Sequence, residues 1–128
     1  MGGRTEQMRP MRDLLARLPL LPLSASQEVD HGAADPALLV AIAEDAEMLM
    51  GAMHQGVGSI GQLLAHSAVM IEDGSIGAEA LEALGFMMAE LGDLASSCMV
   101  LAALCRRETA DYIPQDKSRI FKPAAARR

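Results

Sequence analysis

Two long segments of this chain repeat one spacing of apolar residues, and a single short turn signal separates them. In each segment the apolar positions alternate in steps of three and four, which places them on one side of an α-helix. The segments cover residues 36–72 and 76–110, with the turn at residues 73–75. We therefore predict an all-α fold built on an antiparallel hairpin of two long helices. The two rows are Leu39, Ile42, Ala46, Leu49, Met53, Gly56, Ile60, Leu63, Ser67 and Met70, and then Leu81, Leu84, Met88, Leu91, Ala95, Cys98, Ala102 and Cys105.

The helix ends also carry recognisable signals. Asp35 stands directly before a proline, the pairing expected of an N-cap and first-turn position. Gly74 supplies a left-handed residue for the turn, and Ser75 can cap the second helix. Arg106 and Arg107 suit the negative C-terminal end of the helix dipole, so we expect the second helix to end near them.

The glycine-rich stretch 54–61 is the weak point of the first helix. A glycine inside a helix costs about 1 kcal/mol relative to alanine. A break at this stretch is therefore the alternative to a continuous helix. The apolar spacing keeps the same phase on both sides of the stretch, which a loop has no reason to preserve. We predict one continuous helix.

The composition supports helices and excludes several other classes of protein. Apolar residues make up 51% of the chain, but aromatic residues only 2%, and ten residues are methionine. An aromatic-centred sandwich or barrel and a base-stacking RNA-binding sheet are therefore excluded. The apolar content also excludes disorder over the whole chain.

The apolar faces are wider than one hairpin can bury. Residues 98–105 are apolar on every side, a pattern typical of a fully buried helix. A second hairpin from an identical chain would cover them, so we predict a homodimeric four-helix bundle. Cover by the N-terminal residues of the same chain is the alternative. The predicted dimer or partner interface consists of Met50, Met53, Val57, Ile60, Leu64, Met88, Leu91, Cys98, Met99, Leu101 and Leu104.

Charge divides the chain into an acidic body and two basic ends. No Lys or Arg occurs between Leu18 and Cys105, and this stretch holds twelve acidic residues. An acidic body repels phosphate, so it is a poor binder of nucleic acid. It is suited either to solubility or to recognition of a basic partner. The predicted acidic recognition face consists of Glu44, Asp45, Glu47, Glu82, Glu90 and Asp93.

The two ends of the chain flank the hairpin. Residues 1–35, which we call the leader, are predicted to be mostly unstructured apart from a short amphipathic helix over residues 10–18. That helix either packs on the body or serves as a recognition peptide for a partner. Residues 113–128 form a basic tail, for which a disordered solubilising role is expected. Its cations are Lys117, Arg119, Lys122, Arg127 and Arg128.

The two cysteines and the lack of a targeting signal favour a cytoplasmic location. Cys98 and Cys105 lie about 10 Å apart along one helix, which is too far for a mutual disulfide. Residues 4–26 look like a signal peptide only superficially, because Asp13 and two prolines interrupt the apolar run. Residues 48–71 are uncharged but carry His or Gln at four positions and lack basic flanks. We therefore expect no membrane span.

No pattern of residues points to catalysis or to a cofactor. His54 and His66 point about 120° apart on a helix, and neither has a metal-binding partner at helical spacing. No phosphate-binding loop, hydrolase elbow or paired-cysteine motif occurs in the sequence. We expect a protein that is not an enzyme and has no metal or cofactor.

Three hypotheses for the function follow. The first is a protein–protein interaction module or adaptor built as a homodimeric bundle. The second is an acidic inhibitor or decoy of a nucleic-acid-binding protein, of the kind a phage or mobile element encodes. The third is contact with nucleic acid through the basic tails. Salt-sensitive binding to a basic protein would favour the second, whereas an apolar contact that survives salt would favour the first.

Overall fold

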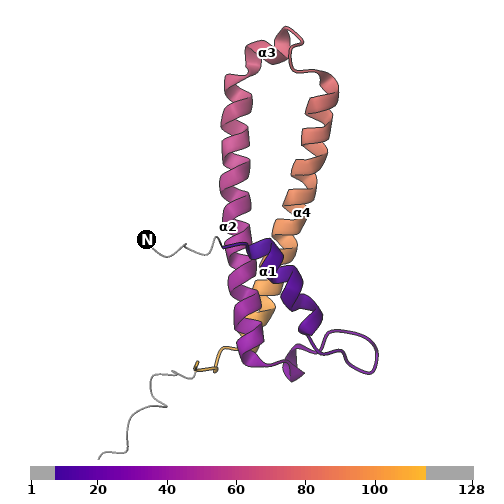
Figure 1. Cartoon of the computed structure of the whole chain (residues 1–128), viewed down its shortest axis with the longest axis vertical. Coiled ribbons are helices and arrows are strands. Elements are labelled where there is room, and N and C mark those ends of the chain that lie inside the picture. The colour runs from indigo at the N-terminus through magenta and orange to yellow at the C-terminus, as the bar shows by residue number, and fades with distance from the viewer. Residues whose placement is uncertain (1–7, 115–128) are drawn as a thin grey trace, which may run out of the picture.

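The computed structural model describes residues 8–114, and within them every regular element is helical. Two long helices pack antiparallel as a hairpin, and a short N-terminal helix crosses it near its open end (Figure 1). This arrangement confirms the predicted all-α helical hairpin. The elements are α1 (Pro10–Arg17), η1 (Leu18–Leu20), η2 (His31–Ala33), α2 (Pro36–His66), α3 (Ala68–Glu72) and α4 (Ala78–Glu108).

Helix α2 begins as its sequence predicts and ends earlier. The Asp35 carboxylate accepts a hydrogen bond from the Ala37 N–H at 3.0 Å, so it caps the helix. The helix runs without interruption through the glycine-rich stretch 54–61. It then breaks at Ser67, whose hydroxyl donates to the Leu63 carbonyl at 2.6 Å. A serine that bonds back to its own helix bends it, and the last turn before the tip is the separate helix α3.

The connection at the tip is longer than predicted. Gly74 has a φ of 80°, the left-handed conformation expected of it. The prediction that Ser75 caps the second helix is wrong. Its backbone N–H instead donates to the Asp73 carboxylate at 2.8 Å, and α4 starts only at Ala78, after Gly77 in the N-cap position. The turn closes because the Ile76 N–H donates to the Met70 carbonyl at 2.9 Å.

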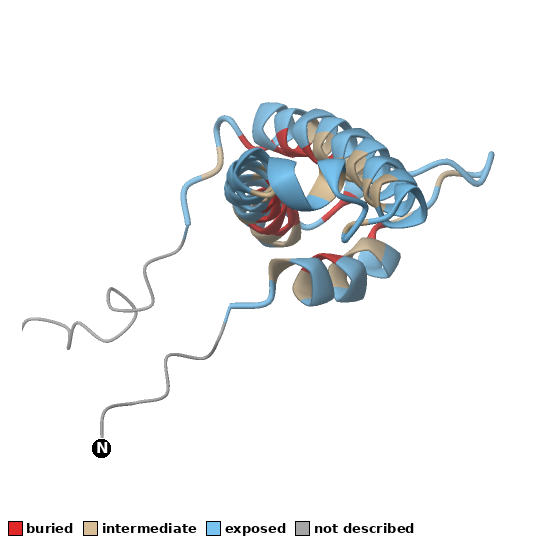
Figure 2. Ribbon diagram, turned by 90° about the horizontal axis from the view of Figure 1, so that it is seen from above, coloured by how far each residue is buried: buried red, intermediate tan, exposed pale blue. Residues whose placement is uncertain are grey.

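Burial divides the hairpin into two unlike halves. The fully buried residues of α2 and α4 all lie in the base, which we define as residues 36–53 and 98–109 together with the leader packed on them. No residue from 54 to 97, the distal half, is buried in the structure (Figure 2). The buried apolar residues are Leu14, Leu21, Ala34, Leu39, Ile42, Ala43, Ala46, Leu49, Met53, Cys98, Ala102 and Cys105.

The leader supplies the third side of this core. Helix α1 lies against one face of the hairpin at the base and buries Leu14 (Figures 1 and 2). The chain then turns through η1, a single bridge between Leu23 and Val29, and η2 before entering α2. Along this path Leu21 and Ala34 are also buried. The short helix of the leader is thus packed on its own body, the first of its two predicted alternatives, and residues 18–35, which were expected to be mostly unstructured, also follow a defined path along the base.

Truncating Leu14 tests whether this docking stabilises the fold. Leu14→Ala removes a side chain that is 4% exposed and is expected to lower the free energy of unfolding by about 2 kcal/mol. Leu15→Ala is the matched control, because its side chain is 59% exposed on the same helix and should change stability by less than about 0.5 kcal/mol. Urea denaturation of both variants measures the difference. Equal losses of stability in Leu14→Ala and Leu15→Ala would contradict the docking of α1.

Candidate interaction surfaces

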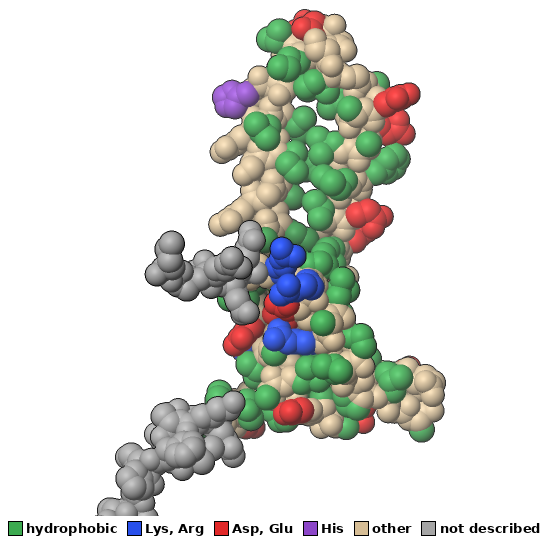
Figure 3. Space-filling view, viewed as in Figure 1, with side chains coloured by type: hydrophobic (Ala, Val, Ile, Leu, Met, Phe, Trp, Pro, Cys, Tyr) green, Lys and Arg blue, Asp and Glu red, His purple; other side chains and the backbone are tan. Residues whose placement is uncertain are grey.

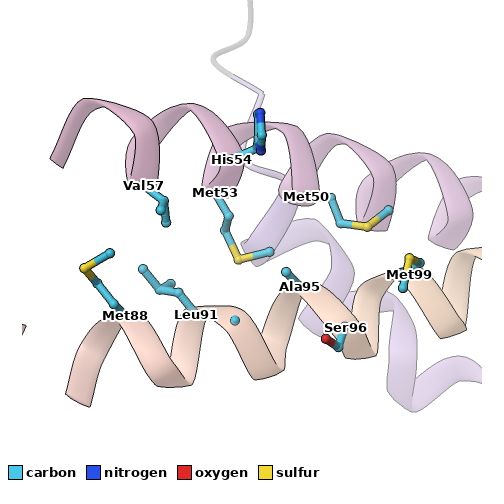
Figure 4. Close-up of a pocket in the computed structure, with 10 residues that line it drawn as sticks. Met50, Met53, His54, Val57, Met88, Leu91, Ala95, Ser96 and Met99 are labelled. Atoms are coloured by element: carbon cyan, nitrogen blue, oxygen red, sulfur yellow. The ribbon is translucent and has the colours of Figure 1, made fainter. Parts of the chain in front are cut away.

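Four methionines from the two long helices line an open apolar groove where the base meets the distal half. The groove has a volume of about 440 Å³. In Figure 4 the Met53 side chain extends toward α4, Met50 lies near Met99, and His54 points away from α4. We call it the methionine groove, and its lining residues are Met50, Met53, His54, Val57, Met88, Leu91, Gly92, Ala95, Ser96 and Met99.

Six residues of the predicted interface meet in this groove. Ile60 and Leu64 continue the same row along α2 and are half-buried. Cys98 was assigned to the interface incorrectly, because it is 2% exposed and belongs to the core of the base. The six are Met50, Met53, Val57, Met88, Leu91 and Met99.

A second apolar groove separates the leader from α4. It has a volume of about 510 Å³ and holds the last two residues of the predicted interface, Leu101 and Leu104, on a different side of α4 from Met99. Sequence reasoning missed this groove because it treated the leader as too small to cover the helix. We call it the leader groove, and its lining residues are Leu18, Leu21, Val29, His31, Ser96, Ser97, Val100, Leu101 and Leu104.

Two members of the predicted acidic face are already paired within the chain. Asp45 is 4% exposed, and its carboxylate accepts a hydrogen bond from the Arg17 guanidinium of α1. This hydrogen bond raises the pKa of Arg17 above its ordinary value. The prediction of Asp45 as an exposed recognition residue is therefore wrong: the side of α2 that carries it is covered by α1.

Glu47 is paired with the other long helix of the hairpin. Its two carboxylate oxygens accept hydrogen bonds from Arg106 Nε and Nη2, both at 3.0 Å. These bonds lower the pKa of Glu47, against the opposing effect of partial burial. The pair ties the start of α2 to the end of α4, so Glu47 stabilises the base. Glu44 alone of the three acids on α2 remains exposed without an ion pair in the described chain.

The free acidic residues gather on α4. Glu82, Glu90 and Asp93 are exposed, and within residues 8–114 none of them forms an ion pair. Glu79 and the exposed Phe86 fall on the same side of the helix by their spacing. Figure 3 shows acidic side chains spaced along α4 in the distal half, with the arginines of α1 grouped nearer the base. We call this row the acidic edge, and its residues are Glu79, Glu82, Phe86, Glu90 and Asp93.

The two cysteines belong to the core of the base. Cys98 and Cys105 are 2% and 0% exposed, and both are free thiols. Burial raises the pKa of each thiol, which disfavours the reactive thiolate. Within the described chain, no group of three His, Cys, Asp or Glu residues could hold a metal ion. The predicted basic-tail residues Lys117, Arg119, Lys122, Arg127 and Arg128 lie outside the described residues.

Helix α4 is long and apolar enough to span a membrane on length and composition alone. Only 17% of its most apolar 18-residue stretch is buried in the hairpin. Glu90 and Asp93 lie near the middle of the helix, where an ionised carboxylate in a bilayer would cost at least about 2.5 kcal/mol. This position of the acids favours water over lipid around α4.

Comparison with protein-family models, with curated proteins and with solved structures finds no match for this chain.

Acid titration tests the pairing of Glu47. Because its pKa is lowered in the folded state, the pair adds stability above the ordinary glutamate pKa of about 4.3 and loses it as the pH falls through the lowered folded value. Glu47→Gln should therefore lower the free energy of unfolding by less than about 1 kcal/mol at pH 7, because the pair is exposed. Below pH 4 this loss should become progressively smaller. Urea denaturation from pH 7 to pH 3 measures the loss, with Glu44→Gln as the control. A cost that persists unchanged at pH 3 would contradict the pairing.

Thiol labelling tests the packing of the base. In the native protein at pH 8, both cysteines should react with Ellman's reagent far more slowly than in urea, because burial restricts access and raises their pKa. Leu14→Ala should accelerate the native reaction by loosening the leader, whereas Leu15→Ala should not. Immediate reaction of both thiols in the native protein would show that the base is not closed.

Proposed function

We propose that the protein is a non-enzymatic protein-binding module that functions as a homodimer. The distal half supports this proposal, because its two helices carry matched apolar rows yet bury no residue. The large apolar side chains that line the methionine groove stay accessible within residues 8–114: Met99 is 59% exposed, and Val57, Met88 and Leu91 are half-buried. An open apolar groove of this kind is typical of an interaction site.

The face that bears the methionine groove suits a second copy of the chain. It lies opposite α1, which contacts the side of α2 that carries Ala41 and Asp45. Residues 48–71, from α2 into α3, carry no formal charge, and the acidic edge of α4 points away from this face. Two copies of a chain with net charge −6 can therefore pack here without bringing their acidic residues together.

Glycines on the same face leave room for another backbone. Gly92 lines the methionine groove, Gly85 lies two turns before it, and Gly61 follows Val57 by one turn. A Cβ added at any of these three glycines would meet no atom within 4 Å. Their open surroundings allow a second helix pair to approach closely. Four adaptable thioethers in the groove can then fill the remaining gaps.

The size of the face agrees with a stable dimer. From Met50 to the tip, α2 and α3 rise about 30 Å, and two helices side by side are about 20 Å wide. The face therefore offers roughly 600 Å², close to the roughly 800 Å² per partner of an ordinary complex. A two-fold axis would place identical faces together and produce the four-helix bundle. In this proposal the module is cytoplasmic, since its thiols stay reduced there.

The acidic edge favours a second candidate function, that of an acidic inhibitor or decoy of a nucleic-acid-binding protein. Its carboxylates are exposed and unpaired within the described chain, so they remain free to replace phosphates in a basic groove.

The neutralisation that tests this candidate is Glu82→Gln, Glu90→Gln and Asp93→Asn. It should abolish binding to such a protein at low salt, while an adaptor that binds through apolar contacts would retain most of its affinity.

Two neighbouring residues provide a matched test of the dimer. Met99 and Val100 are 59% and 58% exposed, but Met99 lines the methionine groove and Val100 the leader groove. Light scattering on the full chain should give twice the 13.6 kDa chain mass. Met99→Lys should weaken the dimer about tenfold or more, the effect of roughly 1.4 kcal/mol, and Val100→Lys should leave it unchanged.

A monomer at all concentrations would contradict the dimer. If Met99→Lys and Val100→Lys weaken the dimer equally, the dimer does not use the methionine-groove face. Circular dichroism of each variant confirms that its helices are retained.

A further inference from the structure

We propose that the leader groove, extended by the acidic edge of α4, binds a basic amphipathic helix of a partner protein. This inference rests on the proposed protein-binding function and assigns its partner a chemistry and a site. The site is separate from the methionine groove, which the second copy would occupy.

The leader groove has the shape and lining of a helix-binding cleft. One wall is formed by Leu18, Leu21 and Val29 of the leader, and the other by Val100 and neighbouring leucines of α4. Val29 and Val100 remain 43% and 58% exposed, so the cleft presents apolar surface that residues 8–114 do not cover. One row of apolar side chains from a partner helix would fill such a cleft.

The acidic edge continues from this groove along the same side of α4. Ser97 lines the groove, Asp93 precedes it by one helical turn, and Glu90 by two turns. Further along, the exposed Phe86 lies between Glu90 and Glu82. From Leu104 to Glu90 the surface spans about 21 Å, the length of a 14-residue helix. A partner helix can thus contact the groove and the acids together.

The charge pattern selects a cationic partner. Glu79 and Glu82, and again Glu90 and Asp93, are like charges three residues apart, which destabilises a helix slightly. Lys or Arg on the partner would relieve this repulsion. A second copy with net charge −6, an anionic lipid surface and a nucleic acid would each be repelled here. The remaining occupant is a protein helix with one apolar row and an adjoining basic row.

A synthetic peptide provides the probe. We would titrate the full chain into a fluorescein-labelled 18-residue amphipathic helix with a leucine row and a lysine row, and record anisotropy. A scrambled peptide of equal composition controls for net charge, and a peptide with glutamate in place of lysine controls for its sign. The amphipathic peptide should bind at least about tenfold more tightly than either control, a difference of roughly 1.4 kcal/mol. Equal binding of the scrambled peptide would overturn the inference.

Variants then locate the binding site. Val100→Lys places a cation in the groove and should weaken peptide binding about tenfold. Met99→Lys, on the other face, should leave peptide binding unchanged. Glu90→Gln with Asp93→Asn should weaken binding severalfold at 50 mM salt, with the difference shrinking as salt screens the charges. Unchanged affinity in Val100→Lys would overturn the inference.

The outcomes separate this inference from the proposed dimer. Peptide binding that needs Val100, in a protein that light scattering shows to be monomeric, would support the inference and contradict the dimer. A dimer that does not bind the peptide would support the dimer and overturn the inference. If removal of residues 115–128 tightens peptide binding tenfold or more, the chain's own basic tail occupies the groove, and the partner helix is overturned.

Discussion

Two antiparallel helices can bury only the strip that lies between them, and this limit shapes the whole structure. At the base a third element overcomes it. Helix α1 lies across one face, and its Leu14 joins the core formed by Leu39, Ile42 and Cys105. In the distal half no described element covers the faces of α2 and α4, and their apolar rows stay half-buried or exposed. The proposed function follows from this difference between the two halves.

The two faces of the hairpin differ in charge as well as in cover. On the face opposite α1, the methionine groove is continued by uncharged residues and glycines, which suits close packing against an identical face. On the side of the leader, an apolar groove runs into a row of carboxylates on α4. Within the described chain no arginine forms an ion pair with that row, and Arg12, Arg17 and Arg106 are paired with other acids. The proposed dimer and the proposed partner helix therefore use different surfaces.

The repeated apolar spacing was sufficient to predict the hairpin and the continuity of α2 through its glycines. The spacing is a local property of the chain, and it holds whatever packs against the helices. The sequence grouped Met50, Met53, Val57, Met88, Leu91 and Met99 in one interface, and in the hairpin these six residues line one groove. Their role as an interface stays a prediction. Helix α2 ends at Ser67, whose hydroxyl donates a hydrogen bond to the Leu63 carbonyl. The spacing of apolar residues gives no information about this bond, so it could not predict where α2 ends.

The sequence left open whether the short helix of the leader docks on its own body, and the error over Asp45 follows from that docking. A short helix is marginal by itself, so its position depends on long-range contacts such as Arg17 with Asp45. The sequence does not reveal that contact. It therefore predicts that Asp45 belongs to a cluster of exposed acids and that a second chain must cover residues 98–105. With the contact, Asp45 is buried, and Leu101 and Leu104 line the leader groove.

The central claim is that a second copy completes the distal half, and hydrogen exchange at different protein concentrations tests it most directly. Amides in residues 54–97 should become markedly more protected as the concentration rises through the dimer dissociation constant, because partner packing suppresses local opening. Amides in the base should show no such change. Distal protection that is low and independent of concentration, in a base that is well protected, would contradict the claim.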